Sequence, residues 1–378
     1  MPTIFTYGDY IGDIKIVRLL RLYRTAAIYE AEWEGLDLLP GSYRRRRKRL
    51  DGAPDQRVLV KVAHRGSEEA LKREATLLAE LAKRPFAGIP SWLPPFIPSG
   101  GDFDPDDEDA RIPKKYGKAV FRGETKYYLV LEYIEGSFLR DLLYENPEPW
   151  YRDAAYITIG VSQTLSMLHR TKRMIHGSIN PDSILVTRSQ KTRIPHITLL
   201  DLGVMFSEDD KLTPQRIQEI RNHVHPAYAA PEMFMAENYI GLSLATDVYG
   251  LGLLLYELLS GKPPYEYALR NDDEIIEDIK DMRSDAPGPQ PLQRLDVARP
   301  KELNEILMRA TAKEPTARFP SLGELRTQLI TLFGDIPPEP RNLSIREASN
   351  AIYVVMILLF VLSAIGAVVL VLLNALGI

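Results

Sequence analysis

The chain has 378 residues, of which 45% are hydrophobic and 26% charged, and its formal net charge is −4. This length suffices for one large two-lobed domain, and a slightly acidic balance gives no general attraction to nucleic acid, so no nucleic-acid partner is expected. The lack of cysteine excludes disulfides, thiolate metal sites and a cysteine nucleophile, and the six scattered histidines lack the paired spacing of a zinc site.

The first part of the chain predicts strands. Four stretches alternate or run apolar and are rich in β-branched and aromatic residues, namely 10–20, 26–35, 57–64 and 126–136. Between the third and the fourth, residues 67–84 place Leu71, Leu78 and Leu81 on one face of a predicted helix. The N-terminus has no basic region followed by an apolar run, so a cleaved signal peptide is not expected.

After Gly136 the predicted elements are helices. The helical stretches are 151–170, 246–261 and 301–333. This division predicts an α+β architecture with a β-rich lobe at about 8–134, a helical lobe at about 135–332, and a hinge near residues 132–136.

Two charged inserts interrupt the β-rich lobe. Arg44 to Arg49 form a basic run, and Asp102 to Asp109 form an acidic one. Solvated loops are the simplest interpretation of both. The alternatives are binding of the basic run to anionic lipid, which would gain roughly 1 kcal/mol per charge, and contact between the two inserts.

The C-terminal end of the chain predicts a membrane helix. Residues 351–376 contain no charged residue and are long enough to cross a hydrocarbon core of about 30 Å. A Pro-rich and polar stretch, 333–350, precedes them as a tether, and its arginines Arg341 and Arg346 favour a cytoplasmic N-terminal domain. The expected protein is therefore single-pass and tail-anchored in the cytoplasmic membrane. Small residues at 363–367 would allow two such helices to pair as a homodimer, although membrane helices are ordinarily rich in small residues.

A series of short motifs then identifies a family. In chain order they are VLVKVA, KREATLLAEL, LVLEYIEG, IHGSINPDSILV, ITLLDLGV, YAAPE, TDVYGLGLLLYELLSGKPPY and EPTARFPS. Their order and spacing resemble the protein kinase fold, and most closely the bacterial Ser/Thr kinases of eukaryotic type. The resemblance covers about residues 8–332 and implies a two-lobed kinase fold, with function to be decided at the site.

Part of the site that this resemblance implies is present. Lys61 matches the strand lysine that holds the ATP phosphates, Glu74 matches its helix partner, and Asp201 matches the aspartate that binds Mg²⁺. The full set of residues expected to contact a nucleotide is Leu59, Lys61, Glu74, Leu131, Glu132, Tyr133, Leu185 and Asp201. These residues imply weak binding of ATP with one Mg²⁺.

Other parts of the implied site are replaced. Arg21, Tyr23 and Ala26 stand where the phosphate-covering loop has glycines, which leave room for backbone amides to approach phosphates. The catalytic loop is altered at four positions, with Gly177 for Arg, Ser178 for the catalytic Asp, Asn180 for Lys and Ser183 for the Asn that holds a second Mg²⁺. Asp182 is the nearest carboxylate, and its position in the motif points away from the phosphates.

Residues that the family uses for folding are retained. Glu232 and Arg318 match an ion pair that braces the helical lobe, and Asp247 matches the aspartate that anchors the catalytic loop. Leu78, His176 and Leu202 match the packed column between the lobes. The resemblance also implies an activation segment between Asp201 and Glu232, and without an Arg before Ser178 its control by phosphorylation is not expected.

The sequence therefore predicts a membrane-anchored pseudokinase that signals by binding a partner kinase or another signalling protein, with a nucleotide as a conformational switch. Two alternatives stay open. One is a Ser/Thr kinase of low rate that relies on Lys61, Glu74 and Asp201. The other is a membrane scaffold without nucleotide, in which Leu59 and Tyr23 fill the pocket.

Overall fold

A computed structural model describes most of the N-terminal part of the chain. The described residues are 4–38, 55–83, 86–95, 114–147, 149, 151–189, 192–235, 242–265, 270–280 and 299–334. Within these ranges, none of the helices has both the length and the apolar character needed to cross a membrane. The predicted membrane helix at 351–376 lies outside the described residues, as do the basic insert at 44–49, the acidic insert at 102–109 and most of the tether.

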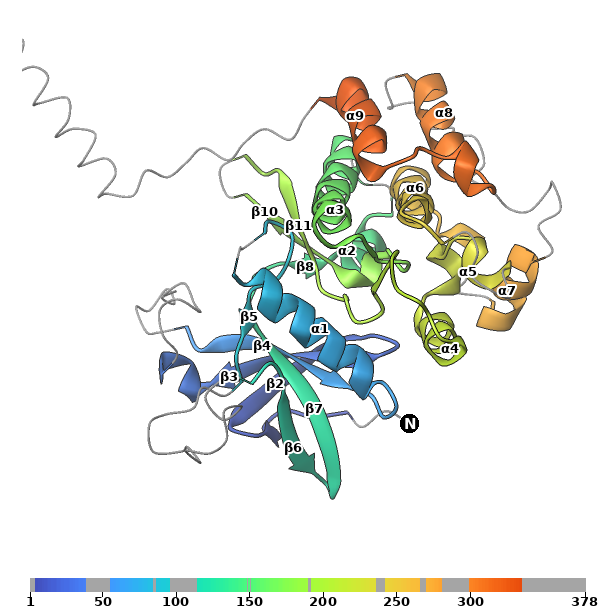
Figure 1. Cartoon of the computed structure of the whole chain (residues 1–378). Helices are drawn as coiled ribbons and strands as arrows, with labels where there is room; N and C mark the ends of the chain where they lie inside the picture. Colours follow the sequence, from blue (N-terminus) through green and yellow to red (C-terminus); the bar gives the residue numbers. More distant parts are fainter. Residues whose placement is uncertain are drawn as a thin grey trace, which may run out of the picture. The chain divides into compact units, whose positions relative to one another are not determined.

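The first lobe is an antiparallel sheet with one long helix against it (Figure 1). Its strands are β1 (Tyr10–Ile11), β2 (Ile14–Leu22), β3 (Ala26–Trp33), β4 (Arg57–Ala63), β5 (Trp92–Leu93), β6 (Gly117–Phe121) and β7 (Glu124–Glu132). They follow the order β1-β2-β3-β4-β7-β5, with β6 also paired to β7. The helix α1 (Glu68–Leu81) packs on β4, β5 and β7.

Strand alternation divides this sheet into two faces. Val58, Val60 and Val62 of β4 belong to one apolar cluster, which β1 to β3 also line. Leu59 points to the opposite face and joins a second cluster with α1 and the helical lobe. Successive side chains of a strand point to opposite faces, so Lys61 lies on the same face as Leu59. Lys61 therefore faces the second lobe, as the alternation of β4 indicates.

The second lobe is mainly helical and begins beyond β7 (Figure 1). Its helices are α2 (Leu139–Glu145), α3 (Tyr151–Lys172), α4 (Pro214–His223), α5 (Glu232–Met235), α6 (Ala245–Ser260), α7 (Asp272–Lys280), α8 (Pro300–Ala310) and α9 (Leu322–Phe333). This lobe also contains five short strands, namely β8 (Ser137–Phe138), β9 (Met174–Ile175), β10 (Ile184–Arg188), β11 (Pro195–Leu199) and β12 (Phe206–Ser207). The two-lobed kinase architecture expected from the motifs is confirmed for the described residues.

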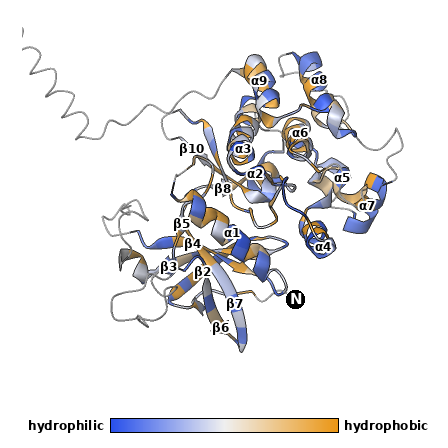
Figure 2. Cartoon of the chain, in the orientation of Figure 1, coloured by the Kyte–Doolittle hydropathy of each residue, from blue (hydrophilic) through white to orange (hydrophobic). Residues whose placement is uncertain are grey.

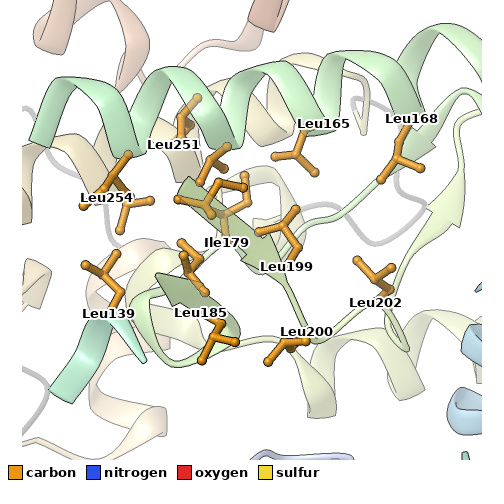
Figure 3. Packing of buried hydrophobic residues seen from close by; sticks show 14 of the residues in the cluster. Leu139, Leu165, Leu168, Ile179, Leu185, Leu199, Leu200, Leu202, Leu251 and Leu254 are labelled. Atoms are coloured by element: carbon orange, nitrogen blue, oxygen red, sulfur yellow. The ribbon is translucent and has the colours of Figure 1, made fainter. Parts of the chain in front are cut away.

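The core of the helical lobe forms around α3 and α6. Leucines of these two helices converge with residues of α2, β10, β11 and the loops beside them (Figure 3). Helices farther out are amphipathic. In α7, hydrophilic residues cover most of the helix (Figure 2), and only Ile275 and Ile279 are buried. The inner helices thus provide a rigid base for the loops between β9 and β12.

The predicted helical stretch at 301–333 is divided in the structure. The helix α8 ends at Ala310, α9 begins at Leu322, and a short 3₁₀ turn at Pro315–Ala317 lies between them. Proline cannot continue a helix, and Ser321 caps α9 by accepting a hydrogen bond from the Glu324 N–H. The break also lets Arg318 enter the core.

Arg318 forms a buried ion pair with Glu232. Its Nη1 lies 2.7 Å from Glu232 Oε1 and its Nη2 lies 2.8 Å from Oε2, and both residues are buried. The guanidinium also donates to the carbonyl oxygens of Ala312, Lys313 and Ala245. Thr246 Oγ1 donates to Glu232 as well. The expected brace therefore joins α5, the start of α6 and the segment after α8.

Removing one partner of this ion pair is expected to destabilise the protein. Glu232→Ala leaves a buried guanidinium without its carboxylate, so the free energy of unfolding should fall by about 3–5 kcal/mol in urea denaturation of the full chain. The control is Lys172→Ala, which breaks an exposed pair with Glu80 at 2.7 Å and should cost less than about 1 kcal/mol. Equal losses in the two variants would contradict the bracing role.

Candidate functional site

The centre of the site is a buried group of three charges from three elements. Lys61 Nζ on β4 lies 2.6 Å from Glu74 Oε2 on α1 and 2.7 Å from Asp201 Oδ1, which follows β11. The third donor of the ammonium reaches the Leu200 carbonyl oxygen at 3.3 Å. Lys61 and Glu74 are each only 1% exposed. The structure therefore brings together the three residues that the motifs selected, and every N–H of the ammonium has a partner within the protein.

The charges in this group shift one another's pKa values. Burial opposes the charge on Lys61, but Asp201 and Glu74 outweigh it and raise the pKa of the ammonium. Burial and the nearby Asp201 raise the pKa of Glu74 against the effect of Lys61. The Leu202 N–H also donates to Glu74 Oε1 at 3.1 Å, which fixes α1 to the segment after β11. These shifts favour the charged form of Lys61, and its contacts link the two lobes.

The residues expected near the adenine come from β4, β7, β10 and the segment that follows β7. Leu59 and Leu131 are register partners on β4 and β7, and both share an apolar cluster with Leu185 of β10. Glu132 and Tyr133 lie where the chain leaves β7. The Glu132 N–H donates to the Ser91 carbonyl oxygen at 2.9 Å, and the Tyr133 ring lies 4.2 Å from the Arg57 guanidinium. The three leucines therefore share one apolar cluster, and Tyr133 packs against the same cluster.

The catalytic loop is held by Asp247, as the motifs predicted. Its carboxylate accepts hydrogen bonds from the N–H groups of His176 at 2.9 Å and Gly177 at 2.8 Å, and from His169 Nε2 at 2.8 Å. Gly177 has a φ of +72°, a conformation that side chains with a Cβ rarely adopt. The glycine in place of the family's arginine therefore suits this backbone.

Neutral side chains occupy the catalytic positions and bond to the protein itself. Ser178 Oγ accepts a hydrogen bond from the His225 N–H at 3.0 Å. Asn180 donates to the Ser178 carbonyl oxygen at 2.8 Å and accepts from the Asp182 N–H at 3.0 Å. Ser183 Oγ donates to the Asn180 carbonyl oxygen at 2.9 Å, and these three residues are buried. The loop is thus closed on itself by hydrogen bonds.

The one carboxylate in this loop, Asp182, is bound by two arginines. Its oxygens lie 3.3 Å from Arg21 Nη1 on β2 and 3.3 Å from Arg140 Nε on α2. Arg140 in turn donates to Glu257 and to the Tyr228 hydroxyl, each at 2.7 Å. Sequence reasoning identified Arg21 as a missing glycine but did not find that it reaches the catalytic loop.

A glutamate links the activation segment to α1. Glu219 of α4 is paired with Arg73 of α1 and, at 2.9 Å, with Arg216 one turn away. Burial opposes the charge of Glu219, but the hydrogen bonds and charges of these two arginines keep its pKa below the usual value. In protein kinases, phosphorylation of this segment creates arginine contacts of the same type, and here a carboxylate provides them. Sequence reasoning missed this contact.

Comparisons with known proteins agree with the motifs. The sequence family described as "Protein kinase domain" matches residues 116–328, which is more than half of the chain. The serine/threonine-protein kinase PknB of Mycolicibacterium smegmatis is 28% identical over 225 residues, which are 59% of this chain and 33% of that protein. The probable serine/threonine-protein kinase SCO3848 of Streptomyces coelicolor is 27% identical over 203 residues, 53% of this chain and 28% of that protein. The chain thus spans about a third of the length of these relatives.

Kinases of this family use ATP and Mg²⁺, and in this structure the residues that would hold them contact one another or the loop backbone. The Lys61 ammonium already has three protein acceptors, and its Nζ lies 5.1 Å from the centre of the Tyr23 ring. Asp201 Oδ1 is bound to Lys61, and Ser183 Oγ bonds to the loop backbone. The groups that would contact phosphate and metal are therefore engaged with one another.

Lys61 is expected to stabilise the fold directly. Lys61→Met leaves Glu74 and Asp201 without their cation, so the free energy of unfolding should fall by about 3–5 kcal/mol in urea denaturation. The matched variant Lys61→Met with Glu74→Leu replaces the Lys61–Glu74 pair by apolar groups and should recover part of the loss, because Asp201 remains without its cation. If Lys61→Met alone were as stable as the wild type, Lys61 would not stabilise the fold, and binding of a ligand would be the better explanation of its position.

Proposed function

Because the chain belongs to the protein kinase domain family, we propose that it is a pseudokinase, a kinase-shaped module that signals by binding another protein. The observation that carries the proposal is the environment of Ser178. This residue stands at the position of the catalytic aspartate, is 5% exposed, and accepts a hydrogen bond from the His225 backbone. A serine hydroxyl has no basicity near neutral pH without a base of its own.

Several substitutions in the catalytic loop each remove a contribution to the rate of phosphate transfer. A missing general base alone lowers a rate by about 10² to 10⁴, which would leave a slow enzyme. Here Asn180 also replaces the loop lysine and Ser183 replaces a metal ligand, so charge neutralisation is reduced as well. Electrostatic stabilisation is usually the largest single contribution to catalysis. The combination supports a protein that does not transfer phosphate at a useful rate.

The retained residues support a binding role. Asp247 holds the loop backbone, Glu232 and Arg318 brace the helical lobe, and Lys61 joins the lobes. All of these contacts maintain a kinase-shaped surface without requiring chemistry. A surface of this kind suits a partner kinase or another signalling protein that recognises a kinase fold.

The location in the proposal rests on the sequence. Residues 351–376 would anchor the protein in the cytoplasmic membrane of a bacterium, with the kinase-like domain in the cytoplasm. Arg44 to Arg49 would add contact with anionic lipid, and pairing of the membrane helices would give a homodimer. The apolar, uncharged character of the C-terminal stretch is what supports this part.

A second candidate function is a Ser/Thr kinase of low rate. It is favoured by the intact contacts of Lys61 with Glu74 at 2.6 Å and Asp201 at 2.7 Å, and by the names of the matched relatives. This candidate requires ATP with Mg²⁺ to reach Lys61. The two candidates differ in whether the full chain transfers phosphate.

Phosphate transfer from labelled ATP to a general protein substrate separates them. We expect the full chain to give the same incorporation with Mg²⁺ as with excess chelator. Ser178→Asp together with Ser183→Asn should raise it by less than about tenfold, because Asn180, Arg21 and Tyr23 remain, although a general base alone can contribute about 10² or more. Robust Mg²⁺-dependent transfer by the wild type would support the slow kinase. Robust transfer by the double variant would show that the loop substitutions alone prevent catalysis.

A further inference from the structure

The turn between β2 and β3 is fixed to the first lobe by its backbone. The Tyr23 N–H donates to the Ala26 carbonyl oxygen at 2.7 Å, and His64 Nε2 donates to the Tyr23 carbonyl oxygen at 3.0 Å. The His64 N–H also donates to the Thr25 carbonyl oxygen at 2.9 Å. These bonds set the direction of the side chains on the turn, which stand at and beside the positions of the missing glycines.

Tyr23 points into the space between the lobes. Its side chain belongs to the same apolar cluster as Leu59 and Leu131, its exposure is 8%, and its ring centre lies 5.1 Å from Lys61 Nζ. Burial, with the charges of Asp201 and Glu74, raises the pKa of the phenol, so the ring is a neutral cover over the lysine. A cation beside an aromatic face is attracted by the ring electrons. Tyr23 thus shields the Lys61 ammonium.

Arg21 crosses from the first lobe to the second. Its Nη2 lies 2.5 Å from Asp141 on α2, and its Nη1 lies 3.3 Å from Asp182 in the catalytic loop. The guanidinium carbon is 4.7 Å from the centre of the Phe138 ring on β8. These three partners belong to the second lobe. One side chain therefore bridges the two lobes.

Arg24 makes a second bridge between the lobes. Its Nη1 and Nη2 lie 2.6 and 2.9 Å from the two carboxylate oxygens of Asp272, at the start of α7. Paired parallel hydrogen bonds of this type are among the stronger polar contacts in proteins. The side chains are 34% and 45% exposed, so salt can screen this pair.

We infer that Arg21, Tyr23 and Arg24 form an autoinhibitory clasp, which closes the cleft between the lobes and fills the place of a nucleotide. The clasp rests on the proposed function in one respect. It would control a protein that acts by binding a partner. It predicts a closed state with the ion pairs formed and an open state with them broken. Interactions that differ between two such states set their populations.

Exposure of Leu59 to a thiol reagent measures this opening. The chain has no cysteine, so Leu59→Cys in the full chain is a single probe at a site that is 1% exposed. Labelling with a small uncharged reagent is compared among three backgrounds. All three carry Leu59→Cys. The first has no other change, the second also has Arg21→Ala and Arg24→Ala, and the third also has Arg18→Ala. The last is the matched control, because Arg18 pairs with Glu30 at 2.8 Å within the first lobe.

We expect labelling to be about tenfold faster or more in the Arg21 and Arg24 double variant, because two bridges that oppose opening are lost. The Arg18→Ala background should label at the rate of the otherwise wild-type chain. Equal rates in all three backgrounds would overturn the clasp. The labelling rate does not depend on phosphate transfer or on a partner. The clasp can therefore be wrong while the proposed function is right, and the clasp can be right while the proposed function is wrong.

Folding of the variant with Arg21→Ala and Arg24→Ala is checked by far-ultraviolet circular dichroism. If this variant does not fold, a series of salt concentrations tests the clasp instead. In the Leu59→Cys chain without other changes, labelling should accelerate several-fold between about 0.05 M and about 1 M sodium chloride, over which the screening length falls to about 3 Å. Leu59→Cys with Tyr23→Phe should behave in the same way, since the ring is kept. A rate independent of salt would overturn the clasp.

Discussion

The contact on which the site depends is the buried ammonium of Lys61 between two carboxylates. Glu74 orients α1, Asp201 orients the segment that follows β11, and Lys61 joins both to the central strand of the first lobe. Such a charge is tolerated in the interior only when its hydrogen bonds are satisfied, and here each N–H has an acceptor. In an active kinase the same lysine would be shared with phosphate. Here its contacts are complete within the protein.

The other residues of the site are likewise bonded within the protein. Positions that need a base, a cation or a metal ligand carry Ser178, Asn180 and Ser183, whose side chains form hydrogen bonds with backbone groups. Positions that anchor backbone, such as Asp247, keep their charge and their partners. This pattern is consistent with the proposed pseudokinase, in which the fold is kept and phosphate transfer is lost.

Motif order predicted the contacts that the family shares, including Lys61 with Glu74 and Asp247 with the catalytic loop, because each position is fixed by its strand or loop. It did not predict the bridges of Arg21 and Arg24 or the pairing of Arg73 with Glu219. These contacts join residues more than a hundred positions apart through long side chains, and no periodic pattern marks them. The division between α8 and α9 was also missed, although Pro315 was visible in the sequence.

The most direct test of a closed, non-catalytic cleft is the melting temperature of the full chain, kept in mild detergent, against rising ATP with and without Mg²⁺. A ligand that binds only the native state stabilises it by about 2.7 kcal/mol at a hundredfold excess over its dissociation constant, so even weak occupancy would register. The account predicts no shift at millimolar ATP in either condition. A saturable, Mg²⁺-dependent rise would contradict it, because a nucleotide would then reach Lys61 in the native protein.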